Sequence, residues 1–190
     1  IDFTQLPHPT YWIRPWKGLP AAAGQHRFTW DLRYEPPRGA DRDYSIAAVY
    51  RQTPSGPHGP FVHPGQFTVR LTVDGEVSEK PVRVRLDPRV TIGEADLQRQ
   101  TDLSLRCYND YHQLQEIRES LDKALSGNPP ADQKEALQKL RGNGDPGAPD
   151  IVYSSITAQA ADRETLVGLQ QKFLYMMELF QSVDAAPTRQ

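Results

Sequence analysis

Residues 64–89 contain the clearest alternation of apolar and polar positions in the chain. Its apolar members before the turn are Phe67, Val69, Leu71 and Val73. A period of two predicts a β-strand with one apolar and one solvent-exposed face. The pair Asp74-Gly75 follows and suits a type I′ turn, because both central residues of that turn need positive φ. Pattern and turn together predict a β-hairpin.

The turn also predicts the register of this hairpin. Odd positions before a two-residue turn face even positions after it, so we expect Val82, Val84 and Leu86 on the same side as Phe67. Pro81 has no backbone donor, and we therefore expect it at an edge or a bulge.

A second strand is predicted over residues 26–34, where Phe28, Trp30, Leu32 and Tyr34 alternate with polar residues. A short third strand is expected over 45–50, and a Pro/Gly-rich loop over 53–65. These signals predict an immunoglobulin-like antiparallel β-sandwich over 25–90, preceded by an extended lead-in over 1–24. Its expected core consists of Phe28, Trp30, Leu32, Phe67, Val69 and Leu71, with Val82 and Val84 on the same side.

At Thr91 the apolar period changes from two to about 3.6, which predicts a helix. Thr91 and Glu94 have the spacing of a capping box, and the helix is expected to run some 30 residues to the stop at 126–130. A short helix is predicted over 131–141 and a last one over 162–183. The chain is thus expected to be α+β, with a long antiparallel helical hairpin over 91–183 and a tail over 184–190.

The two long helices are expected to cover each other's apolar stripes, since a helix of ~45–50 Å would otherwise expose its stripe. The expected seam joins Leu103, Cys107, Tyr111, Leu114 and Leu121 to Leu166, Leu169, Phe173, Met177 and Phe180.

Composition narrows the class of protein. The 190 residues have a net charge of −2 with both signs interspersed, which argues against a nucleic-acid partner. No run is long and apolar enough for a membrane span. The chain opens on Ile1 without an initiator Met, and we expect it to be part of a longer polypeptide. Cys107 is the single cysteine, so no internal disulfide forms and the redox compartment stays open.

Candidate catalytic and metal-binding groups all have ordinary explanations. The carboxylates of Asp31 and Glu35 belong to a strand and its end, whereas Glu94 and Asp96 belong to a first helical turn, where acids favour the dipole. Glycosidase chemistry needs two acids facing each other in a cleft.

Histidines and the cysteine give no stronger signal. His58 and His63 share a loop, but no further ligand is interleaved with them, as a zinc site would need. Cys107 and His112 point apart on a helix, which argues against a thiol nucleophile activated by a base. We expect no catalytic residue, no metal and no cofactor.

The lead-in contains three large aromatic residues, Tyr11, Trp12 and Trp16, without a sustained period. They could form a sugar-binding platform, or they could anchor the lead-in on the sandwich or on a neighbouring domain. Anchoring is the favoured interpretation, and these residues are the possible interaction surface.

The order of AGQHRFTWDLRY, HPGQFTVRLTVDG, LDPRV and a helical pair ending in VDAAPT resembles a known arrangement. It is similar to the C-terminal region of bacterial sortilin-type or Asp-box (BNR) repeat proteins that bear the label "glycosyl hydrolase". The β part is also similar to the immunoglobulin-like domain of flagellar hook-capping proteins.

The first resemblance implies that a β-propeller precedes this region and that the protein is periplasmic or extracellular. It places the glycosidase label in the propeller, and no Asp-box motif occurs in this chain. The resemblance therefore implies a non-catalytic structural or interaction module that packs against the propeller of the same polypeptide. The alternative is an accessory domain that binds carbohydrate or protein through the lead-in aromatics.

Overall fold

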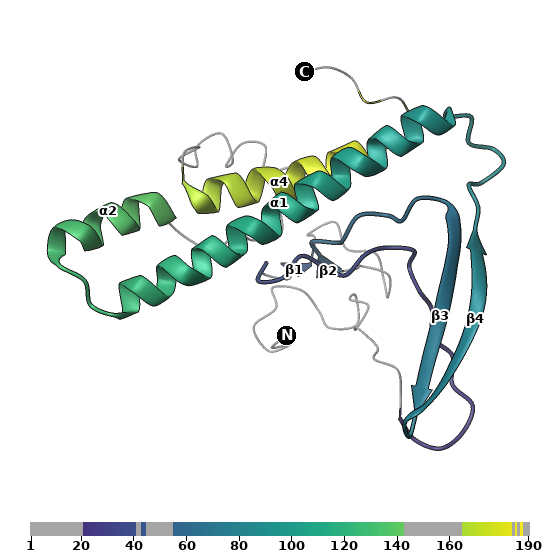
Figure 1. Cartoon of the computed structure of the whole chain (residues 1–190). Coiled ribbons are helices and arrows are strands. Elements are labelled where there is room, and N and C mark those ends of the chain that lie inside the picture. The colour runs from purple at the N-terminus through teal and green to yellow at the C-terminus, as the bar shows by residue number, and fades with distance from the viewer. Residues whose placement is uncertain are drawn as a thin grey trace.

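A computed structural model describes residues 21–40, 43–44, 55–142, 165–183, 185 and 187. The strands are β1 (Asp43–Tyr44), β2 (Ser55–Gly56), β3 (Gly65–Val73) and β4 (Glu76–Val84), and the helices are α1 (Glu94–Ser126), α2 (Ala131–Arg141) and α4 (Leu166–Phe180). The chain is therefore α+β. In Figure 1 the β3–β4 hairpin stands away from the long axis of the helices.

Helix α1 is the long helix that the period change predicts, but the predicted capping box is wrong. The helix begins two residues later than Thr91 would require, with extended Gly93 at the N-cap and no side-chain cap. The backbone N–H groups of Asp96 and Leu97 bond to the Gly93 carbonyl oxygen instead. Thr91 lies two residues before the cap, too far to bond the first free donors. Glu94 and Asp96 supply the favourable negative charge of the first turn.

The predicted stop of α1 and the short helix after it are confirmed. Asn128 adopts a positive φ of 53° directly before two prolines, which cannot continue a helix. Helix α2 then packs against the C-terminal part of α1, where the Arg141 guanidinium donates to the Asp122 carboxylate at 2.7 Å.

Helix α4 packs along the N-terminal part of α1 in the opposite direction (Figure 1). The order of the cross-links shows the direction, because Ser104 bonds to the Met177 carbonyl whereas Gln115 bonds to Gln170. Thr165 caps α4, its hydroxyl oxygen accepting from the Gly168 N–H. The buried core of the molecule lies between the two helices and comprises Cys107, Tyr111, Leu174 and Met177.

The seam between α1 and α4 is rotated from the predicted one. Cys107, Tyr111 and Met177 are buried as expected, but Leu103 and Leu114 are only half-buried. Polar residues take their place in the buried face of α1, namely Gln100, Thr101, Ser104, Gln115 and Arg118. An apolar periodicity cannot reveal such positions. Their burial is tolerable because their side chains form hydrogen bonds, as Ser104 and Gln115 do across to α4.

The β3–β4 hairpin has the predicted register. Phe67 lies opposite Val82 and Gly65 opposite Val84, with positive φ at both Asp74 and Gly75 in the turn. Pro81 lies opposite Thr68 within an unbroken ladder, so it occupies an edge strand and no bulge forms.

The predicted strand over 26–34 is wrong. Its only ladder contact in the described chain is an isolated antiparallel bridge between Arg33 and Phe61. The Asp31 carboxylate accepts from the Arg33 N–H, and Leu32 adopts a positive φ of 61°. A non-glycine residue in that conformation ends an extended strand. The predicted strand over 45–50 and the lead-in up to residue 20 lie outside the described residues.

The predicted β core is also wrong. Phe28 is 62% exposed and Val69 50% exposed, and Leu32, Leu71 and Val82 are exposed too. Trp30 and Phe67 do pack together, edge to face with 5.4 Å between ring centroids. The physical reason is that the described residues form two separate two-stranded sheets, and no second sheet faces the hairpin among them.

Candidate functional site

The residues proposed from sequence do not come together in the described part of the chain. Tyr11, Trp12 and Trp16 lie outside it. Within it, no group of three or more His, Cys, Asp or Glu side chains is placed to hold a metal ion. His63 and Glu94 approach each other, with 3.4 Å between Nε2 and Oε1, but not in hydrogen-bonding alignment.

Cys107 and His112 have separate environments, as their spacing predicts. The Cys107 thiol lies in the core beside Leu174, and burial raises its pKa to about 11. His112 packs edge to face on Tyr108 and accepts the backbone N–H of Arg38 at 3.1 Å. A protonated buried thiol is a poor nucleophile.

A junction of charged and aromatic groups joins the loop at 57–63 to α4. The Arg33 guanidinium stacks over the Phe61 ring at 3.5 Å and donates to the Gly59 carbonyl at 2.9 Å. Burial lowers the pKa of Arg33, and burial raises the pKa of Glu178 on α4. The His58 backbone and the Arg33 charge partly offset the cost of ionising Glu178. The two charges therefore support each other in a half-buried setting.

Gln181 completes this junction. Its side-chain carbonyl accepts from the Phe61 N–H at 2.7 Å, and its amide donates to the Phe61 carbonyl at 3.2 Å. The Gln181 side chain thus bonds both backbone groups of Phe61, as a residue of a neighbouring β-strand would. Gly59 lies so close to the backbone of Tyr34 and Glu35 that a Cβ atom would collide with their carbonyl oxygens. The loop is therefore held between residues 34–35 and α4.

The sequence contains one signal for this junction. Lys172 and Glu178 are the only charged residues of α4. A carboxylate in so apolar a helix indicates a specific neighbour, because a lone buried charge is costly.

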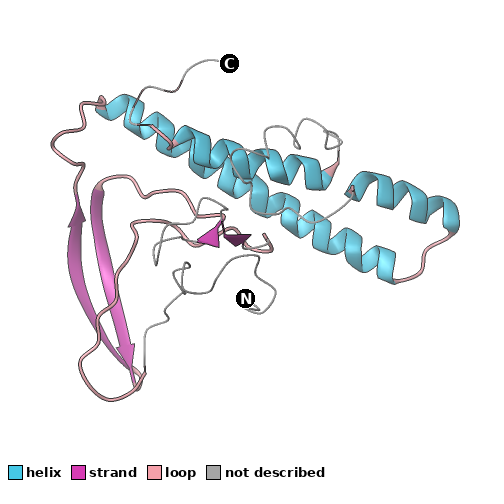
Figure 2. Cartoon of the chain, turned by 180° about the vertical axis from the view of Figure 1, so that it is seen from behind, coloured by secondary structure: helices cyan, strands magenta, loops and turns pink. Residues whose placement is uncertain are grey.

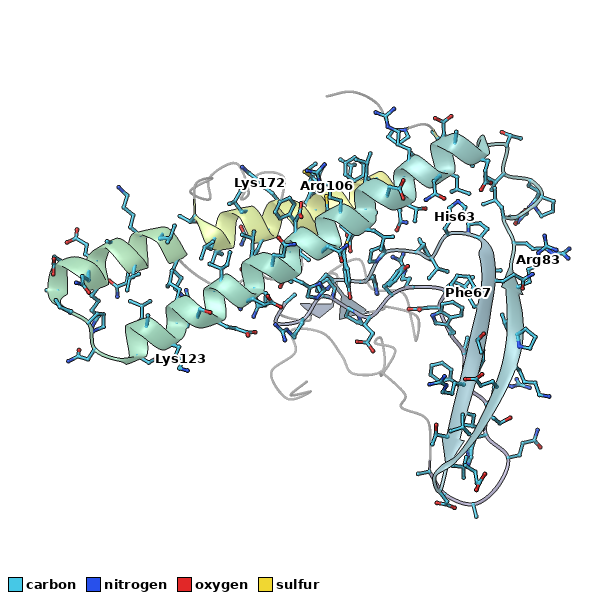
Figure 3. All side chains as sticks on the ribbon, in the orientation of Figure 1. His63, Phe67, Arg83, Arg106, Lys123 and Lys172 are labelled. Atoms are coloured by element: carbon cyan, nitrogen blue, oxygen red, sulfur yellow. The ribbon has the colours of Figure 1, made fainter. Side chains whose placement is uncertain are left out.

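One side of the hairpin carries a row of apolar side chains that we call the hairpin face: Phe67, Val69, Leu71, Val73, Val82 and Val84. On β4 the same side also carries the polar residues Glu76, Ser78 and Lys80. The hairpin extends away from the helices in both views, and Phe67 lies at the end of β3 nearer to α1 (Figures 2 and 3). Val69, Leu71 and Val73 are each about half exposed. On the opposite side, Arg70 bonds to Glu79 at 2.6 Å.

Burial is the main cause of the shifted pKa values of Arg33, Cys107 and Glu178. The hairpin face, in contrast, is an extended row of exposed apolar side chains, which is typical of protein contacts.

Comparison with known proteins finds no match among family models, curated proteins or solved structures. Among the helices of the described ranges, none has the length and apolar character that a membrane crossing requires.

Proposed function

We propose that this chain is a non-catalytic interaction module whose hairpin face packs against another part of a larger polypeptide. The supporting observation is the row formed by Val69, Leu71 and Val73, which stays about half exposed on a hairpin of nine-residue strands. A two-stranded hairpin is marginally stable in water without a packing layer. The missing layer is the proposed contact.

The finer architecture belongs to the same proposal. The hairpin supplies part of an immunoglobulin-like sandwich over 25–90, and α1 and α4 form the helical hairpin over 91–183. The partner is the β-propeller that the sequence resemblance implies, and the polypeptide is periplasmic or extracellular. The junction at Arg33, Phe61 and Gln181 would hold the sandwich to the helices.

Hydrogen exchange tests this proposal. The chain is compared by itself and joined to the polypeptide that precedes it. Peptides covering β3 and β4 should exchange more slowly in the joined protein, and the double change Val69→Thr with Leu71→Thr should remove this protection. Ile117→Thr is the matched control, because Ile117 is equally exposed, at 49%, on α1. Equal exchange in both forms would contradict the proposal.

Two further assays decide among the alternatives. A panel of aryl glycosides should not be turned over by the isolated chain. Turnover that a single carboxylate substitution abolishes would show an enzyme instead. Polysaccharide binding that Trp12→Ala and Trp16→Ala abolish would show the accessory carbohydrate-binding domain.

A further inference from the structure

The outer edge of β3 is open to another strand. Next to a two-residue turn, the flanking residues Val73 and Glu76 exchange both backbone bonds, and such pairs alternate along an antiparallel ladder. Even positions of β3 therefore turn their N–H and C=O groups away from β4. These outward positions are Gln66, Thr68, Arg70 and Thr72. No backbone hydrogen bond from the described ranges reaches them.

The outer edge of β4 is closed by its sequence. By the same alternation Pro81 is an outward position, where it offers no donor. Charged neighbours such as Glu79 and Arg83 add to this protection, since proline and charge are the usual means of blocking an edge. Strand β3 has a single charge, Arg70, and Glu79 already neutralises it. The hairpin thus has one blocked edge and one receptive edge.

We propose that β3 pairs with β3 of a second copy of this chain, antiparallel across a two-fold axis through Val69. Val69 is the centre of the nine-residue strand Gly65–Val73, so this register pairs the whole strand. Thr68 then lies opposite Arg70 of the partner subunit, and outward groups meet outward groups. Such self-complementarity is what a two-fold interface demands.

Neighbouring registers of the two β3 strands are less favourable. An axis through Arg70 shortens the overlap and sets Arg70 against Arg70 of the partner subunit, and like charges directly opposite are destabilising. An axis between two residues pairs outward groups with inward groups and leaves backbone bonds unmade.

The Val69-centred register also joins the two hairpin faces. Phe67 lies opposite Leu71 of the partner subunit on the same side of a four-stranded sheet, so the apolar rows become continuous. Sheets of three or more strands with an apolar face are stable where single hairpins are not. The new pairing cannot extend before Gly65 as far as Val62, because the Val62 N–H already bonds to the Leu32 carbonyl. This pairing uses the backbone groups at the outer edge of β3. It is therefore independent of whether another part of the polypeptide covers the hairpin face.

Sedimentation equilibrium of the full chain tests the pairing with two matched variants. Arg70→Pro and Glu79→Pro each remove the same ion pair and one outward N–H, but on opposite edges of the hairpin. We expect the unchanged chain to dimerise, Glu79→Pro to dimerise nearly as well, and Arg70→Pro to raise the dissociation constant about tenfold or more. A monomeric unchanged chain, or equal effects of both variants, would overturn the pairing.

Disulfide formation gives a second test of the pairing, and its variants place no proline in the hairpin. Val69→Cys places two thiols directly opposite each other on the axis, within the reach of a disulfide. Leu71→Cys places its thiols opposite Phe67 of the partner subunit, several residues apart. We expect an oxidised dimer from Val69→Cys alone, with Cys107 left buried and uninvolved. Absence of that dimer would overturn the proposal.

Discussion

Gln181 holds Phe61 through both of its backbone groups, accepting its N–H at 2.7 Å and donating to its carbonyl at 3.2 Å. The two residues are 120 positions apart in the chain. This contact fastens the loop that leads into β3 to the end of α4. It therefore joins the β part of the molecule to its helices.

Removing this contact should loosen the loop. We expect Gln181→Ala to lower the free energy of unfolding by about 1–2 kcal/mol, because two hydrogen bonds are lost. The amide hydrogen of Phe61 should also exchange faster. The matched control is Ser182→Ala, whose hydroxyl donates to the Leu179 carbonyl in the last turn of α4 and not to the loop. An unchanged exchange rate at Phe61 would show that the contact does not hold the loop.

The α1–α4 seam should carry most of the stability of the helices. Leu174 is fully buried, at 0% exposure, whereas Leu179 on the same helix is 39% exposed. We expect Leu174→Ala to cost about 2–5 kcal/mol and Leu179→Ala clearly less, as measured by urea unfolding. Comparable losses from the two identical substitutions would place the core elsewhere.

Stability near Glu178 should depend on pH with a defined sign. Its folded pKa lies above 4.5, chiefly because of burial. The folded protein binds the Glu178 proton more tightly than the unfolded chain does. This contribution to the free energy of unfolding is fully present below pH 4.5 and is lost as pH rises through the folded pKa. Glu178→Gln stays neutral, so its unfolding free energy should fall less between acid and neutral pH. A constant difference between variant and parent across this range would refute the linkage.

Cys107 gives a second pH signature at alkaline pH. Its thiol pKa rises from 9.0 to about 11 on folding, so its contribution is complete below pH 9.0 and is lost as pH rises toward about 11. We expect a Cys107→Ala variant to show a flatter decline of stability in this window. The native thiol should react with a thiol reagent about 100-fold more slowly than in denaturant, because the thiolate is scarce. Rapid native labelling would contradict its burial.

Local sequence determined the elements whose reasons are local. The Asp74-Gly75 turn specified the register of β3 and β4, because positive φ is available at both positions. The existence of α1, its C-terminal end and the short helix α2 followed from apolar spacing and from the proline stop after Asn128. These signals act over a few neighbouring residues, so the structure they specify does not depend on tertiary contacts.

Tertiary structure decided the rest, since it depends on contacts between distant residues. The alternation over 26–34 predicted a strand, but the Asp31–Arg33 bond and the positive φ of Leu32 bend the chain there. Gln115 and Gln170 bury their amides in the seam because each finds a partner across it. The junction of Phe61 and Gln181 could not be predicted, since a polar side chain shows its partner only once the fold brings the two together.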